Sequence, residues 1–271
     1  MRFPDFLVIG GMRCGTTSLF ELLRQQPDIY LPEKKELHYF DRRNPQLTND
    51  AQYKAVFASA RADQVCGEVT PDYLTTANCA EAIHALLPRV KLIVVLRDPV
   101  DRAWSHYQFS RFHKVETEIL ERALDLEEER LALATDHTDI FFSYQQRGRY
   151  IEHLLRYESL FGRAQMHVIF LNDLLTSTGD TVEKMMRFLG CDVAQAGSIN
   201  EFPSVNRISG YQALELELTQ GKERRGVLQR LRTSMTRKPP KMPVKARERL
   251  QQYFQPYDLQ LEKWLVRPLA W

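Results

Sequence analysis

The chain has 271 residues, of which 44% are hydrophobic and 27% charged, and its 37 basic residues nearly balance its 35 acidic ones. These values are typical of a soluble globular protein with one sizeable core, and a net charge of +2 does not favour nucleic acid as a partner. No apolar run approaches the roughly 18 residues of a membrane span. The first predicted strand begins at Phe6, which leaves no room for a signal peptide, so we expect a cytoplasmic protein.

Short apolar strands alternate with helices along the chain, a pattern that is typical of βαβ units. In order, the sequence predicts strand 6–9, helix 17–25, strand 65–69, helix 77–87, strand 91–96, a helix from Pro99 to about 112, helix 150–161, strand 166–171, helix 179–189 and helices 244–254 and 257–265. The run KLIVVL at 91–96 is continuous and β-branched, as a strand covered on both faces should be. We therefore expect one α/β domain over residues 1–271, with a P-loop-like central parallel sheet and helices on both faces.

The segment FLVIGGMRCGTTSL at 6–19 is similar to a phosphate-binding loop. Gly10, Gly15 and Thr17 have the spacing of G-x-x-x-x-G-K-[ST], but Thr16 stands in the place of the lysine. A glycine turn that leads into a helix presents backbone N–H groups to an anion. Arg13, inside the loop, adds a planar and permanently charged group. The loop thus predicts a nucleotide whose end group carries less charge than a triphosphate and needs no metal.

A second candidate anion site follows the strand at 91–96. Arg97 stands at the carboxyl end of that strand, where open α/β sheets bind their ligands. Ser105 comes eight residues later, about two turns into the next helix. Arg97 and Ser105 could together hold a separate phosphate near the first loop.

Together these two segments resemble the PAPS-dependent sulfotransferases, and most closely the Golgi-type branch that contains the glucosaminyl sulfotransferases of heparan sulfate. PAPS is 3′-phosphoadenosine 5′-phosphosulfate, and PAP is the bisphosphate left after transfer of the sulfuryl group. The resemblance extends over nearly the whole chain through KKELHYFD (34–41), RGRYIEHLLRY (147–157) and HVIFLNDL (167–174). It implies PAPS as co-substrate, PAP as product and no metal.

The resemblance also implies roles for single residues. Glu36 aligns with the catalytic base, and His38 aligns with a neighbouring histidine of the acceptor site. Arg13 stands where the heparan sulfate enzymes usually have lysine, and in this it resembles the tyrosylprotein branch instead. The implied catalytic residues are therefore Glu36, Arg13 and His38. The implied nucleotide-binding residues are Arg13, Cys14, Gly15, Thr16, Thr17 and Ser18 at the 5′ end, and Arg97 and Ser105 at the 3′-phosphate.

The C-terminal part departs from the family pattern. The family's paired cysteines near the C-terminal loop are not evident, because the four cysteines lack such an arrangement, and we expect reduced thiols. The usual Lys-Gly-Arg of that loop is represented by MTRKPP at 235–240, which makes Arg237 and Lys238 the candidates there. Tyr211 is a further candidate for a residue beside the nucleotide.

The acceptor must approach from segments outside the nucleotide loops. The segments 34–43 and 109–149 combine cationic and aromatic residues, and they offer Arg42, Arg43, Arg111 and Lys114 as candidate acceptor-binding residues. Such a mixture suits a carbohydrate or a carbohydrate-like metabolite better than a phenol or a lipid. The sequence does not determine the identity of the acceptor or the oligomeric state.

Two other classes of function stay open at this point. A P-loop-like kinase of a small metabolite would need Mg²⁺ and an acidic ligand, for which Asp98 is the candidate, but Thr16 in the lysine position argues against it. A non-catalytic polyanion-binding module would use residues 222–249, which carry eleven Lys or Arg against two Glu.

Overall fold

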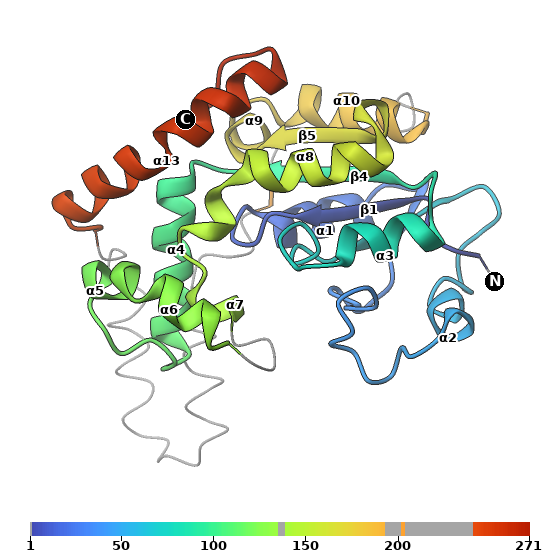
Figure 1. The fold of residues 1–271 in the computed structure, drawn as a ribbon. Helices are drawn as coiled ribbons and strands as arrows, with labels where there is room; N and C mark the ends of the chain where they lie inside the picture. Colours follow the sequence, from blue (N-terminus) through green and yellow to red (C-terminus); the bar gives the residue numbers. More distant parts are fainter. Residues whose placement is uncertain (1, 135–138, 193–201, 204–240) are drawn as a thin grey trace, which may run out of the picture.

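Five parallel strands form a single sheet within the residues that the structure, a computed structural model, describes: 2–134, 139–192, 202–203 and 241–271. The strands are β1 (Phe6–Gly10), β2 (Ile29–Tyr30), β3 (Val65–Val69), β4 (Lys91–Leu96) and β5 (Met166–Phe170), in the spatial order β2-β3-β1-β4-β5. Figure 1 shows the sheet in the middle of the molecule, with helices before and behind it. The predicted α/β fold with a central parallel sheet is confirmed.

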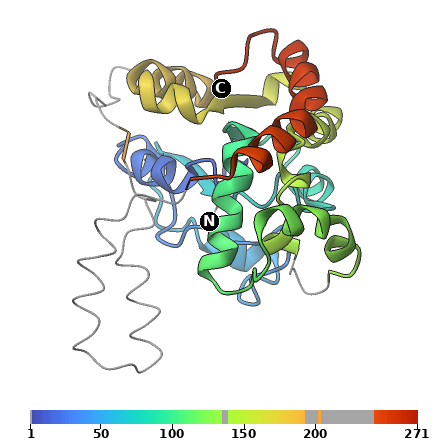
Figure 2. The ribbon, with the colours of Figure 1, turned by 90° about the vertical axis from the view of Figure 1, so that its left-hand side faces the viewer.

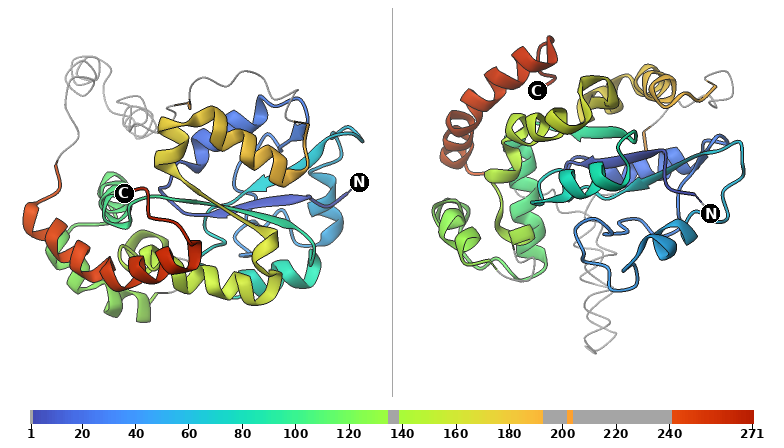
Figure 3. Two further views of the ribbon diagram at one scale, coloured as in Figure 1. Left: turned by 90° about the horizontal axis from the view of Figure 1, so that it is seen from above. Right: turned by 45° about the vertical axis from the view of Figure 1, so that its right-hand side comes forward.

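The side chains of the central strands alternate between two cores. Leu7 and Ile9 of β1 join a cluster with α3 (Cys79–Leu86) and α8 (Tyr150–Phe161), whereas Phe6 and Val8 join one with α1 (Thr16–Arg24) and α10 (Thr178–Leu189). The left panel of Figure 3 shows these helix pairs on opposite faces of the sheet. Burial on both faces explains why β1 and β4 are continuous apolar runs.

The C-terminal segment corrects one prediction. Instead of two helices, residues Val244–Leu265 form the single helix α13, with Pro256 inside it. A proline removes one intrahelical hydrogen bond and costs about 3 kcal/mol in a helix interior. Phe254 before the proline and Leu261 after it are both buried, in the cores that α13 shares with α4 (Pro99–Phe112) and α8. We infer that packing on both sides of Pro256 offsets this cost.

Several short elements were not predicted. They are β2, α2 (Asp50–Ala55), α5 (Leu120–Asp125), α6 (Glu127–Ala132), α7 (Asp139–Phe142), α9 (Leu171–Thr176) and the 3₁₀ turns η1 (Gln146–Gly148) and η2 (Arg163–Gln165). The helices α4, α5 and α13 form a third hydrophobic cluster at one side of the sheet. Figure 2 looks onto this side and shows α4 lengthwise, with α13 crossing it. In the part of the chain that the structure describes, no helix is both long and apolar enough to cross a membrane.

The parallel arrangement decides where a site can form. Because all strands run in the same direction, the residues that follow β1, β3 and β4 meet at one edge of the sheet. The glycine loop follows β1, the turn Thr70–Tyr73 follows β3, and Arg97 follows β4.

Candidate active site

A cavity of about 440 Å³ lies at this carboxyl edge of the sheet. Its walls come from the loop after β1, the irregular segment 35–43, the turn after β3, Arg97 after β4, and Ser105 and Phe109 of α4, with a partly apolar rim from later segments. Ten of the residues predicted for the site line it: Arg13, Gly15, Thr16, Thr17, Ser18, Glu36, His38, Arg43, Arg97 and Ser105. Residues predicted to bind the nucleotide and residues predicted to act on the acceptor thus share one cavity.

The glycine loop leads directly into α1. Gly15 is the N-cap residue, with a φ of 89° and no side chain to cap the helix. A side chain at this position would be strained by the left-handed backbone, and its Cβ would lie 2.7 Å from Leu171 Cδ1. The first turn therefore offers its backbone N–H groups, together with the partly exposed hydroxyl of Thr17, to an anion.

Arg13 and the second predicted anion site lie against each other. The Arg13 Nε donates a hydrogen bond to Ser105 Oγ at 3.2 Å, and an Arg97 guanidinium nitrogen donates to the Arg13 carbonyl at 3.4 Å. The Arg13 guanidinium also lies over the ring of Phe109, 5.1 Å from its centroid. Burial and the neighbouring charge of Arg97 lower the pKa of Arg13. The two guanidinium groups concentrate positive charge at one end of the cavity, which favours an anionic ligand there.

Glu36, His38 and Asp41 form a hydrogen-bonded and electrostatic series beside the loop. The His38 Nδ1 lies 2.7 Å from Asp41 Oδ2, and its Nε2 lies 3.9 Å from Glu36 Oε2. Lys35 Nζ donates a hydrogen bond to the other carboxylate oxygen of Glu36. Although partial burial favours the neutral ring, the hydrogen bond and charge of Asp41 raise the pKa of His38 above its ordinary value of 6.5. Asp41 was missed in the sequence, although it stands three residues after His38 in the quoted segment.

The three residues predicted to be catalytic share an unusual backbone. Arg13, Glu36 and His38 have φ values of 66°, 63° and 53°, in the left-handed region that favours glycine. Residues held in such regions cost about 1–3 kcal/mol each and cluster at active sites. This geometry supports a functional role for the segment around Glu36.

A buried ionic network forms the floor of the cavity next to this segment. Asp72 receives a hydrogen bond from Arg43 at 2.9 Å and one from Arg147 at 2.5 Å. Burial opposes the charged form of Asp72, but Arg147 and Arg43 hold the pKa of its carboxyl below the ordinary range. Asp72 and Arg147 were not predicted as site residues, because only the fold brings residues 43, 72 and 147 together.

The family model described as "Sulfotransferase domain" matches residues 3–264. The chain belongs to the sulfotransferase family. This enzyme is 30% identical over 279 residues to heparan sulfate glucosamine 3-O-sulfotransferase 6 of Homo sapiens, an alignment that covers 100% of this chain and 74% of that protein.

Solved sulfotransferase structures agree with the fold. A sulfotransferase from Alicyclobacillus acidocaldarius matches with a TM-score of 0.76 and 26% identity, over 100% of this chain and 98% of that one. The mouse sulfotransferase SULT7A1, complexed with PAP, matches with a TM-score of 0.53 and 17% identity, over 94% of this chain and 84% of that one, and supports the fold alone.

Some predicted residues of this sulfotransferase are not brought to the cavity. The Cys14 side chain is fully buried, with its Sγ 3.7 Å from the Tyr150 hydroxyl, so only its backbone is left to contact a ligand there. The Arg42 guanidinium lies over the ring of Tyr39. Arg111 donates hydrogen bonds to the carbonyls of Glu116 and Thr117. Arg42, Arg111 and Lys114 do not line the cavity.

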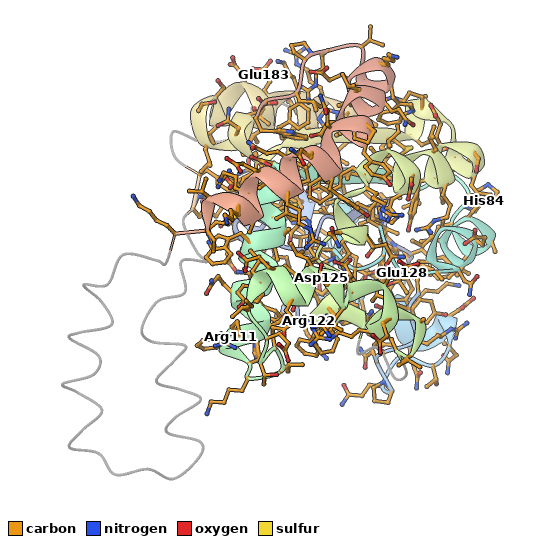
Figure 4. All side chains as sticks on the ribbon, turned by 60° about the vertical axis from the view of Figure 1, so that its left-hand side comes forward. His84, Arg111, Arg122, Asp125, Glu128 and Glu183 are labelled. Atoms are coloured by element: carbon orange, nitrogen blue, oxygen red, sulfur yellow. The ribbon has the colours of Figure 1, made fainter. Side chains whose placement is uncertain are left out.

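Figure 4 shows Arg111 at the edge of the molecule, in the same region as Arg122 of α5. The remaining candidates for nucleotide contacts, Tyr211, Arg237 and Lys238, lie outside the described residues, as does most of the basic stretch 222–249.

The structure gives Asp98 a different role from the one that a kinase would need. Its carboxylate accepts hydrogen bonds from the backbone N–H groups of Val100, at 2.8 Å, and Asp101, at 3.4 Å, and so caps the N-terminus of α4. Asp98 does not line the cavity. Its acidic character is explained by the helix cap, because a carboxylate is a preferred N-cap.

Proposed function

We propose that this enzyme transfers the sulfuryl group of PAPS to a hydroxyl group of a carbohydrate acceptor, with Glu36 as the general base. One observation carries the proposal. In a chain of the sulfotransferase family, the glycine loop with Arg13 and the pair Glu36–His38 line the same cavity. A donor held by the first would present its transferable group to an acceptor held by the second.

The residues of the loop end of the cavity fit a nucleotide with two anionic ends. The start of α1 supplies backbone amides and the hydroxyls of Thr16 and Thr17, and Arg13 adds a positive charge. Arg97 and Ser105 supply a guanidinium group and a hydroxyl for a second anionic group. We assign the start of α1 with Arg13 to the 5′-phosphosulfate, and Arg97 with Ser105 to the 3′-phosphate, as the family resemblance implies.

In the proposed reaction an acceptor oxygen forms a bond to sulfur while the bond between sulfur and the 5′-phosphate oxygen breaks. Glu36 takes the proton of the acceptor hydroxyl, and its partly exposed carboxylate is accessible for this. His38, fixed by Asp41, orients the acceptor and supports the charge of Glu36. Arg13 neutralises the negative charge that develops on the leaving phosphate. As in phosphoryl transfer, positioning and electrostatics supply most of the catalysis.

A carbohydrate acceptor is favoured by the relatives and by the walls of the cavity. The similar human protein is a heparan sulfate glucosamine 3-O-sulfotransferase. The acceptor end carries Lys35, Glu36, His38 and Arg43, which are hydrogen-bonding groups suited to sugar hydroxyls and their acidic substituents.

Thermal stabilisation by a panel of ligands tests the function. We expect PAP to raise the melting temperature in the presence of EDTA, and to do so at lower concentration than ATP with Mg²⁺ or heparin, since stabilisation grows as RT ln(1 + [L]/Kd). A preference for ATP with Mg²⁺ would contradict the proposal and favour the kinase. Stabilisation by heparin alone would favour the polyanion-binding module. An assay with PAPS and a panel of glycans and phenols then tests the acceptor class, and transfer to phenols alone would overturn the carbohydrate assignment.

A further inference from the structure

A buried tyrosine outside the reacting groups holds the backbone of the catalytic segment. The hydroxyl oxygen of Tyr73 accepts hydrogen bonds from the backbone N–H groups of Tyr39, at 2.8 Å, and Phe40, at 3.4 Å. These two residues lie directly after His38 and directly before Asp41. Tyr73 lies in the turn after β3, and the residues on both sides of this turn donate backbone hydrogen bonds to β1, from Thr70 to the Val8 carbonyl at 3.0 Å and from Leu74 to the Ile9 carbonyl at 2.7 Å. The segment that Tyr73 holds contains no helix or strand. The Tyr73 side chain is fully buried, so bulk solvent has no access to this contact.

The orientation of the Tyr73 hydroxyl depends on Glu68. The Tyr73 hydroxyl donates its hydrogen to Glu68 Oε1 at 2.6 Å, so its lone pairs face the two backbone N–H groups. Glu68 is 1% exposed, and its carboxylate also accepts hydrogen bonds from Tyr53 and Thr70. Burial raises the pKa of Glu68, and these three hydrogen bonds oppose that effect. Because three hydroxyl groups donate to this one buried carboxylate, Glu68 fixes which way the Tyr73 hydroxyl points.

The held segment is the one that needs support. Glu36 and His38 both adopt left-handed backbone conformations, which persist only where the surroundings impose them. The Glu36 N–H is anchored at one end by the Val69 carbonyl at 3.0 Å. The Tyr73 hydroxyl supplies the anchor at the other end, on the far side of His38.

We propose that Tyr73 is a positioning residue for sulfuryl transfer: its hydroxyl, oriented by Glu68, keeps the 36–41 segment in the conformation that aims Glu36 at the acceptor. The inference rests on the proposed function, in which Glu36 is the base. Tyr73 does not line the cavity, so it acts through the backbone of Tyr39 and Phe40 and not by contact with a ligand.

The chain offers a matched control. Tyr53 is also fully buried, and its hydroxyl donates to the other oxygen of Glu68, but it makes no hydrogen bond to the 36–41 segment among the described residues. Tyr53→Phe and Tyr73→Phe therefore each remove one phenol hydroxyl from the same carboxylate. The stacking of the Tyr53 ring on Tyr39, with 4.2 Å between centroids, is kept in the phenylalanine variant.

We expect Tyr73→Phe to lower kcat at saturating PAPS and acceptor by roughly 10- to 100-fold, because a small misplacement of a catalytic group has effects of that size. The Kd for PAP should change less than about twofold, since the nucleotide residues are untouched. Tyr53→Phe should keep kcat within about threefold of the unchanged enzyme. Amide hydrogen exchange at Tyr39 and Phe40 should accelerate in Tyr73→Phe alone.

Equal kcat values for the two variants would overturn the inference. If Tyr73→Phe does not fold, Glu68→Leu provides the second test. Leucine is of similar size but removes the acceptor that orients the Tyr73 hydroxyl, so we expect kcat to fall while the Kd for PAP is retained, and an unchanged kcat would overturn the inference. Glu36→Gln separates this result from the proposed function: full activity in that variant would refute the base assignment, whatever Tyr73→Phe shows.

Discussion

The two ends of the cavity are built in different ways. The donor end consists of the loop and first turn of α1 after β1, together with Arg97 directly after β4 and Ser105 and Phe109 of α4. The acceptor end is the irregular segment 35–43, held by side chains from other parts of the chain, including Tyr73 and Asp72. The donor end forms where segments that follow two central strands meet, whereas the acceptor end is one irregular segment held by side chains from elsewhere in the chain, so mutations should separate nucleotide binding from chemistry.

The largest expected effect comes from a substitution at the acceptor end, and it should change kcat without changing nucleotide affinity. Glu36→Gln keeps the shape of the side chain but removes the base, and we expect kcat to fall by roughly 10²- to 10⁴-fold. Calorimetric titration with PAP should give an unchanged Kd. Glu33→Gln, an exposed neighbour three residues earlier, is the control and should keep full activity. A Glu36→Gln enzyme that retains most of its kcat would remove Glu36 from the mechanism.

The next effect is at the donor end and on affinity. Arg97→Ala should weaken PAP by roughly 10- to 100-fold, the size expected for losing a hydrogen bond to a charged group. Adenosine 5′-phosphosulfate lacks the 3′-phosphate, so its affinity should change much less, and calorimetry with both ligands measures the difference. Arg89→Ala serves as control, because Arg89 is exposed at the opposite end of β4. Equal losses for both ligands would argue that Arg97 does not contact the 3′-phosphate.

A third test concerns the charge on His38. Asp41 raises the pKa of His38 in the folded enzyme. The pair therefore adds its full contribution to the free energy of unfolding at a pH below about 6.5, the pKa of histidine in the unfolded chain. This contribution is lost as the pH rises through the higher pKa of His38 in the folded enzyme. Asp41→Asn should therefore lower the pKa of His38, which an NMR titration of the imidazole measures. Asp63→Asn, an exposed carboxyl paired with Arg61, should leave the titration unchanged. An unchanged His38 titration in Asp41→Asn would refute this coupling.

The smallest effect should come from cations that lie outside the cavity. The double variant Arg111→Ala/Lys114→Ala should leave the KM for the acceptor within about twofold, because neither residue lines the cavity. Arg43→Ala should raise that KM more, since it removes a cavity-lining guanidinium and one partner of Asp72. Steady-state kinetics at saturating PAPS compares them, and a larger rise in the double variant would extend the acceptor site onto the surface near α5.

Much of the fold could be predicted because its signals are local. The strands 65–69 and 91–96 and the helix 150–161 have the predicted bounds. The short elements between α4 and α8 were missed because their few residues carry too little periodicity, and the two-helix prediction for the tail failed because tertiary packing outweighs Pro256. The extension of one domain over all 271 residues stays a prediction, as does the cytoplasmic location.

The site residues also fall into those that local sequence patterns predict and those that only the fold brings together. Arg13, Thr16, Thr17, Arg97 and Ser105 could be chosen from the sequence because each follows a recognisable strand. The network Arg43–Asp72–Arg147 could not, because it joins residues that are up to 104 positions apart only after the sheet has formed. The roles of the chosen residues stay predictions, which the experiments above address.

Arginine at position 13 has a consequence for how the reaction should respond to alkali. A guanidinium group stays protonated at any pH at which the fold survives, whereas an amine in the same loop would lose its proton near the top of the working range. In the proposed reaction the leaving phosphate then departs as an anion that the Arg13 guanidinium stabilises, without taking a proton from Arg13. The alkaline limb of the rate profile should therefore contain no contribution from position 13.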